Sequence, residues 1–243
     1  CLFACQSVIV HACRPETATA PASPVPTATY APTTARPTML DLLLSDTLTA
    51  SDAEPGDYLG YSVAISGNNV VAGAPYDSNS GSAYVFRMTD GGASSVEVAK
   101  LTASDGASGD WFGHAVAIDG ATIVIGTESG GAAYVFHTTD DWDTHTEIKL
   151  TASDGVPHDN FGPSVAIEDA TIVVGAYRDD DGGADSGSVY VFRTSNSGAS
   201  YNEVAKLKAH NAAENDQFGY SVAIDGGVVV AGAYNKGSKK GSS

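Results

Sequence analysis

The sequence predicts an all-β protein, and three observations carry that prediction. Glycine supplies 27 of the 243 residues, above its usual share of about 7%, while charged residues make up only 17%. Short apolar runs are joined by turns such as Asp119-Gly120 and Asp225-Gly226, a pattern typical of β-hairpins. One block of sequence also recurs four times along the chain. Together these features favour many short strands over a bundle of helices.

The charge balance narrows the classes of partner. Asp and Glu outnumber Lys and Arg by 29 to 12, which gives a formal net charge of −17. Nucleic-acid binding needs Lys and Arg to neutralise phosphates, so we expect no nucleic-acid partner. No apolar stretch approaches the roughly 20 residues that cross a bilayer as a helix, so we expect no integral membrane span in this sequence.

Two segments precede the repeats. Residues 1–13 are mostly apolar and hold all three cysteines, Cys1, Cys5 and Cys13, so disulfides cannot hold the rest of the chain together. One interpretation is the remnant of a signal segment, and the alternative is a fragment end with no targeting role. Residues 14–38 contain six of the ten prolines and are rich in Thr and Ala. We expect residues 1–38 to be disordered and dispensable for the repeats, with 14–38 acting as a linker.

The repeats fill residues 39–243. A Leu-Thr-Ala-Ser-Asp-Gly block begins at Leu101 and returns at Leu150, with a partial copy at Leu48 and an altered one at Leu207. Each copy then has an aromatic residue or Leu followed by Gly, and a second glycine thirteen residues later. The glycine pairs are Gly60/Gly73, Gly113/Gly126, Gly162/Gly175 and Gly219/Gly232. We place the copies at about 48–100, 101–149, 150–206 and a truncated 207–243.

Each complete copy predicts four short strands, called A to D in chain order. In the first copy these are Ser62–Ile65, Val70–Gly73, Ala83–Phe86 and Val96–Leu101, and Leu42–Leu48 occupies the strand D position before it. Strands A and B are apolar on both faces and therefore need cover on both sides. Radial stacking provides that cover, and four strands in about 40–50 residues are typical of a β-propeller blade. We predict four-stranded antiparallel blades in an incomplete propeller, about 3.5 blades of a larger ring, with open ends prone to association.

The repeated motifs resemble a known family. Phe-Gly, followed thirteen residues later by Gly-Ala-Pro at Gly73–Pro75, resembles the FG-GAP repeat of integrin α-subunit β-propellers, in the short-turn form of bacterial and algal surface proteins. The resemblance covers residues 48–243 and implies a propeller at the cell surface or outside the cell. Integrin blades carry a calcium loop between strands A and B, where this chain has only a short turn such as Asp119-Gly120. That calcium site therefore does not transfer to this chain.

The loops between strands B and C hold the densest oxygen ligands. Calcium takes six to eight oxygens, so the third copy predicts a calcium site and the first copy a weaker one. The candidate ligands are Asp179, Asp180, Asp181 and Asp185 in the third copy and Asp77 and Asn79 in the first. The second copy has only Glu128 in a loop that is too short. The alternative is a solvated acidic turn whose side chains bind local backbone groups.

A second set of acidic residues recurs before each Phe-Gly. The pairs are Asp52/Asp57, Asp105/Asp110, Asp154/Asp159 and Asn211/Asp216. A feature present in every blade favours a structural duty, so we expect side-chain to backbone hydrogen bonds that shape the connection from strand D to strand A.

Nothing in the sequence points to catalysis. The histidines lack metal-site spacing, and no nucleophile elbow, phosphate loop or dinucleotide fingerprint occurs. We therefore expect a non-enzymatic binding or adhesion scaffold, extracellular or at the cell surface, with a protein or glycan ligand on loops at one end. Trp111 and Trp142 are candidates for stacking on sugars, or are simply part of the blades. The alternatives are an accessory propeller of a larger secreted hydrolase and a structural surface-layer protein.

Overall fold

The all-β prediction is confirmed. The computed structural model describes residues 7–12, 43–89, 94–156 and 158–236, so the predicted linker at 14–38 lies outside the described residues. Within them the chain forms sixteen β-strands and one short 3₁₀ turn. No helical segment in the described ranges is long and apolar enough to cross a membrane.

Three four-stranded antiparallel sheets form the body of the molecule, and each follows the order A–B–C–D predicted for one blade. We call them blades 1, 2 and 3. Blade 1 is β3 (Ser62–Ser66), β4 (Asn69–Ala74), β5 (Ser82–Thr89) and β6 (Ser94–Leu101). Blade 2 is β7 (Phe112–Asp119), β8 (Thr122–Thr127), β9 (Ala133–His137) and β10 (Thr146–Leu150). Blade 3 is β11 (Phe161–Glu168), β12 (Thr171–Ala176), β13 (Ser188–Arg193) and β14 (Asn202–Leu207).

A two-stranded sheet lies at each end of this row of blades. At the C-terminal end, β15 (Phe218–Asp225) and β16 (Val228–Ala233) are the predicted strands A and B of the fourth copy. At the N-terminal end, β2 (Leu43–Thr49) is the predicted strand D, and it pairs with β1 (Ser7–Ala12). The expectation that all of residues 1–38 are disordered is therefore wrong for β1. Its β-branched run Val8-Ile9-Val10 favours a strand, and β2 offers it an edge.

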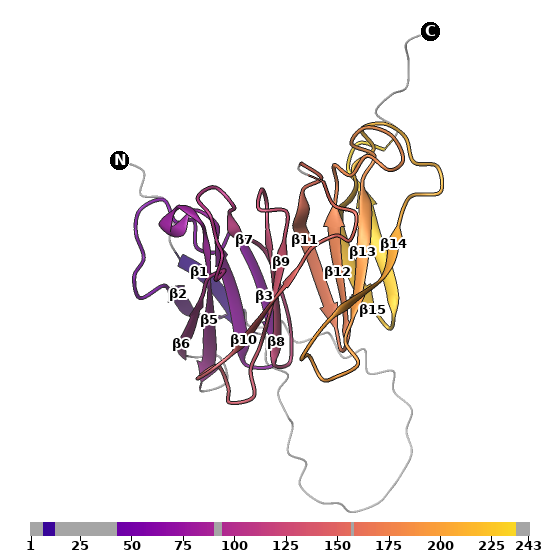
Figure 1. Cartoon of the computed structure of the whole chain (residues 1–243). Helices are drawn as coiled ribbons and strands as arrows, with labels where there is room; N and C mark the ends of the chain where they lie inside the picture. Colours follow the sequence, from indigo (N-terminus) through magenta and orange to yellow (C-terminus); the bar gives the residue numbers. More distant parts are fainter. Residues whose placement is uncertain (1–6, 13–42, 90–93, 157, 237–243) are drawn as a thin grey trace, which may run out of the picture.

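The sheets stack face to face in an open arc with the β3, β7, β11 and β15 strands side by side (Figure 1). Aromatic side chains fill the space between neighbouring sheets. Phe112 meets the rings of Tyr134 and Phe136 edge-on at 5.5 and 5.9 Å, and all three rings are buried. The blade 2–blade 3 interface has a matching cluster around Phe161, in which Phe161 meets Tyr190 and Phe192 of blade 3. Tyr and Phe two residues apart in strand C share one face of the sheet, because side chains alternate along a strand.

The recurring glycines mark where neighbouring backbones touch. In the first three pairs, the second glycine is the last but one residue of strand B, and it lies against the backbone carbonyl of the Phe-Gly glycine in the next blade. A Cβ built on it would lie 1.9 Å from that oxygen for Gly73 and Gly113, 1.8 Å for Gly126 and Gly162, and 2.0 Å for Gly175 and Gly219. Only glycine fits such an approach, which explains why both glycines of the spacing recur.

Candidate functional site

The predicted calcium loop of blade 3 gathers its carboxylates around a lysine. Asp179 is buried, and it accepts hydrogen bonds of 2.8 Å from the hydroxyls of Ser188 and Tyr190. Its second carboxylate oxygen also lies 2.8 Å from Lys206 Nζ. Burial raises the pKa of Asp179, but the hydrogen bonds from Lys206 and Ser188 outweigh burial and hold that pKa below its usual value.

The other predicted ligands divide into two groups. Asp181 joins Asp179 at the same ammonium, 2.9 Å from Lys206 Nζ. Asp180 is exposed and instead accepts the backbone N–H of Asp185 at 2.8 Å. Across the described ranges, no group of three or more His, Cys, Asp or Glu side chains is arranged to hold a metal ion. A calcium ion bound by Asp179 and Asp181 would have to displace Lys206, and calcium at this loop stays a prediction.

Blade 1 repeats the arrangement with the weaker candidate pair. Asp77 is buried and accepts a 2.8 Å hydrogen bond from Tyr84, while its oxygen lies 2.7 Å from Lys100 Nζ. Burial raises the pKa of Asp77, but Lys100 and neighbouring hydroxyls outweigh it, so the pKa falls to about 2. Asn79 ends the short 3₁₀ turn η1 (Asp77–Asn79), and its backbone carbonyl accepts the N–H of Gly109 in the loop before blade 2.

The recurring aspartates have two separate duties. The second of each pair accepts a backbone N–H three residues earlier, as predicted; these are Asp57, Asp110, Asp159 and Asp216, at 2.6–2.8 Å. The first reaches forward to a tyrosine of strand C and a lysine of strand D in the following blade, a longer reach that the sequence did not reveal. These contacts join Asp52 to Tyr84 and Lys100, Asp105 to Tyr134 and Lys149, and Asp154 to Tyr190 and Lys206.

Blade 2 departs from this scheme because its B–C loop carries Glu128 in place of a buried aspartate. Glu128 turns toward the start of blade 3 and accepts hydrogen bonds from Tyr177 Oη at 3.0 Å and Asn160 Nδ2 at 3.3 Å. Its other oxygen lies 3.2 Å from Nε2 of His114. Burial and the nearby Glu128 carboxylate raise the pKa of Tyr177 to about 12. Glu128 therefore ties blade 2 to blade 3.

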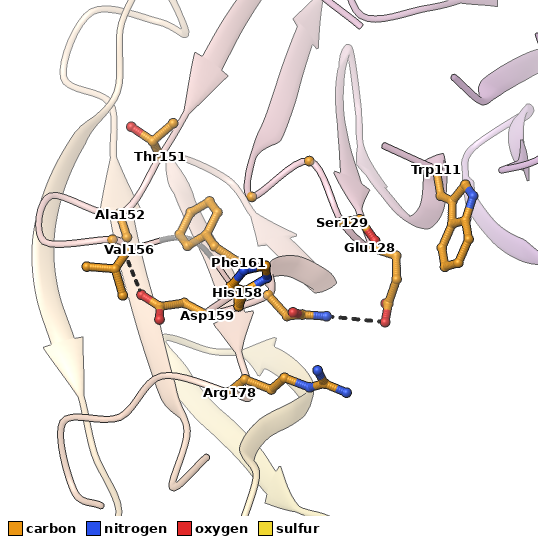
Figure 2. Close-up of a pocket in the computed structure, with 14 residues that line it drawn as sticks. Trp111, Glu128, Ser129, Thr151, Ala152, Val156, His158, Asp159, Phe161 and Arg178 are labelled. Carbon is orange, nitrogen blue, oxygen red and sulfur yellow. Dashed lines mark hydrogen bonds between the residues drawn. The ribbon is translucent and has the colours of Figure 1, made fainter. Parts of the chain in front are cut away.

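The short loop of blade 2 also opens a cavity. In blades 1 and 3 the B–C loops span 75–81 and 177–187, and they reach the next blade through backbone bonds: Phe112 N–H to the Ser80 carbonyl at 2.8 Å, and Phe218 N–H to the Ser186 carbonyl at 2.9 Å. The blade 2 loop spans only 128–132. Where the longer loops would lie, a cavity of about 750 Å³ opens between blades 2 and 3 (Figure 2).

The cavity combines a ring with charged and polar groups. Its walls include Trp111, Glu128, His158, Asp159, Asn160 and Arg178 (Figure 2). Arg178 is exposed, with its guanidinium 5.6 Å from the centre of the Tyr177 ring. Burial raises the pKa of Asp159. Of the two tryptophans, Trp142 is 2% exposed in the core, so only Trp111 lies at the cavity.

A row of exposed rings leads to the cavity from blade 1. Tyr58 lies 5.0 Å from Tyr76, and Tyr76 lies 5.5 Å from Trp111, measured between ring centres. Tyr58 and Tyr76 are 52% and 42% exposed. Neighbouring exposed aromatic rings are more typical of a surface that binds a ligand or partner than of a surface that contacts only water.

Comparison with known proteins identifies the repeat. The family model described as FG-GAP repeat matches residues 45–86, 96–136, 145–192 and 196–243. The chain belongs to the FG-GAP repeat family. Comparison of this FG-GAP chain with curated proteins gives no match.

Solved structures resemble the FG-GAP chain only distantly. They include Sqt1 of Saccharomyces cerevisiae, with 14% identity, a TM-score of 0.43 and coverage of 66% of this chain and 37% of that one. A putative 6-phosphogluconolactonase of Bacteroides uniformis has 13% identity, a TM-score of 0.48 and coverage of 71% and 48%. The glutaminyl cyclase of Myxococcus xanthus has 10% identity, a TM-score of 0.39 and coverage of 71% and 60%. The FG-GAP chain thus spans less than two thirds of each of these structures.

Sequence reasoning singled out the acidic loops and missed the cavity. One feature of the sequence could have indicated the cavity, because the second B–C loop is the shortest of the three. Trp111, Glu128 and Arg178 belong to separate segments of the sequence, and only the fold brings them to one cavity.

Proposed function

We propose that this FG-GAP chain is a binding module of the cell surface or extracellular space, without catalysis of its own, and that it binds a glycan in the cavity between blades 2 and 3. The observation that carries the proposal is the cavity itself. It opens where one loop is short, and it is bordered by Trp111, Glu128 and Arg178. The cell-surface location is supported by the family, whose repeats are typical of such proteins.

The lining suits the chemistry of a sugar. Hydroxyl groups both donate and accept hydrogen bonds, so they pair with a carboxylate acceptor such as Glu128 and a guanidinium donor such as Arg178. A sugar also has an apolar face that packs on an aromatic ring, which Trp111 supplies. Few convergent polar groups around a concave site fix the orientation of a small ligand.

The extent of the surface favours an oligosaccharide over a single sugar. The exposed rings of Tyr76 and Tyr58 continue outward from Trp111, so a chain of sugars can follow them across blade 1. Arg178 lines the cavity and forms no ion pair with a carboxylate of the described residues, which favours a glycan that carries carboxylates.

The two tryptophans make the proposal measurable. Trp142 is buried, so a change in tryptophan fluorescence on adding an oligosaccharide reports Trp111. The probes are a neutral and a uronic-acid tetrasaccharide, titrated by fluorescence and by calorimetry. We expect the uronic acid to bind, and Trp111→Ala or Arg178→Ala to weaken it about tenfold each.

The matched control is Trp142→Phe, which keeps the Trp111 signal and should keep the affinity. Binding that survives both cavity substitutions unchanged, or no heat from either sugar at millimolar concentration, would contradict the glycan proposal. Release of reducing sugar from either tetrasaccharide would contradict the absence of catalysis.

A further inference from the structure

A second cavity lies at the other end of the sheets, between blades 1 and 2. Its volume is about 500 Å³, and it is bordered by the A–B turns of both blades and the C–D turn of blade 2. The B–C loops lie at the opposite end, because successive turns of an antiparallel sheet alternate between its two ends. Both flanking blades are complete four-stranded sheets. The lining includes Asn69, Arg87, Asp141 and Trp142.

Three polar groups at this cavity are buried without a hydrogen-bond partner among the described residues. They are Asn69 Oδ1, Arg87 Nε and the indole nitrogen of Trp142. Asn69 and Arg87 lie opposite each other in the pairing of β4 with β5, so their side chains leave the sheet on the same face. Trp142 is 2% exposed and follows Asp141, whose carboxylate lies 2.8 Å from Arg87 Nη2. Buried polar groups without partners cost stability, so a ligand that pairs with them is favoured.

The matching positions between blades 2 and 3 bond to each other. Thr122 and His137 hold the positions of Asn69 and Arg87, because each pair is the first of its pairing between strands B and C. Thr122 Oγ1 and His137 Nδ1 are 3.0 Å apart in a hydrogen bond. The unpaired groups between blades 1 and 2 are therefore not a general feature of the repeat.

Trp142 also has a backbone conformation that disfavours a large side chain. Its φ is +77°, and its counterpart in the C–D turn of blade 3 is Gly198, at +87°. The two residues correspond because each donates its backbone N–H to the hydroxyl of the threonine four residues earlier. A bulky residue with positive φ is strained, and such strain is concentrated at sites where the side chain has a function. Here a tryptophan stands where glycine would fit with less strain, and it brings an indole N–H to the cavity.

We propose that this second cavity binds a neutral sugar, with one hydroxyl group placed at the three unpaired groups. A hydroxyl oxygen accepts hydrogen bonds from N–H donors, which Arg87 Nε and Trp142 Nε1 supply. The same hydroxyl donates its hydrogen to Asn69 Oδ1. The volume of the cavity is within the range of small-molecule sites. This site is separate from the glycan cavity between blades 2 and 3, and neither depends on the other.

The charges around the second cavity favour a neutral ligand over an anion. Asp140, Asp141 and Asp143 are exposed in the C–D turn of blade 2, and of the described lining residues only Arg87 is a cation. Arg87 pairs with Asp141 through Nη2, which leaves Nε for the ligand. The two side chains of this ion pair are 32% and 63% exposed. Ion pairs so exposed contribute little to stability, so the pair can open and admit a sugar to the buried groups.

The two tryptophans make a specific test possible, because each indole N–H gives its own NMR resonance and Trp111→Phe identifies which is which. The probes are D-glucose, D-galactose and D-mannose, added at millimolar concentration to the ¹⁵N-labelled full chain. We expect at least one hexose to shift the Trp142 resonance and to leave the Trp111 resonance in place. Arg87→Lys keeps a cation for Asp141 but removes the Nε donor, and it should weaken binding about tenfold.

The matched control is Arg193→Lys, because Arg193 holds the position of Arg87 in blade 3, and it should leave the affinity unchanged. No shift of either resonance with any hexose would mean that ordered water alone pairs with the buried groups, and would overturn the proposal. A shift of the Trp111 resonance alone would place the sugar between blades 2 and 3, and would also overturn it. The same holds for a Trp142 shift whose affinity Arg87→Lys leaves unchanged. The uronic-acid titration tests the other cavity separately.

Discussion

The packed inner strands repeat the same contacts from blade to blade, whereas the loops at one end of the molecule differ between blades. Between the inner strands, the same glycine-to-carbonyl contact recurs at three interfaces with nearly the same geometry. At the loop end, the three B–C loops differ in length, and the interface with the shortest loop opens into a cavity. Backbone contact leaves no space for a side chain, whereas each loop is held by local bonds that can change without moving the sheets. The packing of the sheets is thus repeated from blade to blade, and the loop surface where we propose binding is not.

The largest effect should come from the inner strands. A Cβ at Gly126 would lie 1.8 Å from the Gly162 carbonyl oxygen, so the two backbones must separate. We expect Gly126→Ala to lower the free energy of unfolding by about 3 kcal/mol, measured by urea denaturation. The matched control is Gly232→Ala, whose Cβ meets the mobile Ser221 hydroxyl, and it should cost far less. Equal costs would mean that the carbonyl contact does not set the blade spacing.

The acidic clusters should come next, and they should differ between blades. The Asp179 side chain is 4% exposed beside Lys206, whereas that of Asp105 is 51% exposed beside Lys149. Removing a buried partner leaves a charge uncompensated, so Asp179→Ala should cost about 3 kcal/mol of unfolding free energy. Asp105→Ala should cost less than about 1 kcal/mol. Chemical denaturation of both variants measures the two losses of unfolding free energy. If the blade 3 loop were only a solvated acidic turn, the two losses would be equally small.

Acid should weaken the clusters within a defined range. The pKa of Asp77 is about 2 in the folded chain and about 4 when unfolded, so its contribution is fully present above pH 4. That contribution is lost as the pH falls toward 2, because between pH 4 and 2 the Asp77 carboxyl binds a proton in the unfolded chain but not in the folded one, which favours the unfolded chain. Asp77→Asn should flatten the loss of stability between pH 4 and 2 in urea titrations. The exposed Asp143→Asn is the charge-matched control and should keep the wild-type slope.

The loop end should tolerate a change that abolishes binding. Replacing residues 128–131 with residues 177–187 of blade 3 should fill the cavity, while the sheets keep their glycine contacts. We expect the thermal midpoint to change little and the calorimetric signal of the uronic-acid tetrasaccharide to disappear. Retained binding in this variant would place the glycan elsewhere on the molecule.

Calcium should have the smallest effect of all. The Asp179 carboxylate already pairs with Lys206 and accepts hydrogen bonds from two hydroxyls. We therefore expect millimolar calcium to give no heat in calorimetric titration. Heat that is present in the wild type and absent in Asp181→Ala would instead establish the calcium site that the loop composition predicts.

The sequence predicted most of the fold because its signals are local. The thirteen-residue glycine spacing and the short apolar runs predict strands A to D of each blade directly. β1 was missed because it pairs with β2 across residues 13–42, and no local pattern encodes a partner that far away. The site was predicted only in part. Acidic residues in the Asp179 loop are visible in the sequence, but Lys206 reaches them only through the pairing of β13 with β14.

The forward reach of Asp52, Asp105 and Asp154 bears on how the molecule responds to force. Each of these side chains follows strand D of one sheet yet fastens strands C and D of the next. When tension pulls strand D out of one blade, the turn that carries the aspartate moves with it, and the next blade loses the hydrogen bond between that aspartate and its strand C tyrosine. We therefore expect the blades to unfold one after another and not independently. With repeat periods of 53, 49 and 57 residues, each event releases about 170–200 Å of extended chain.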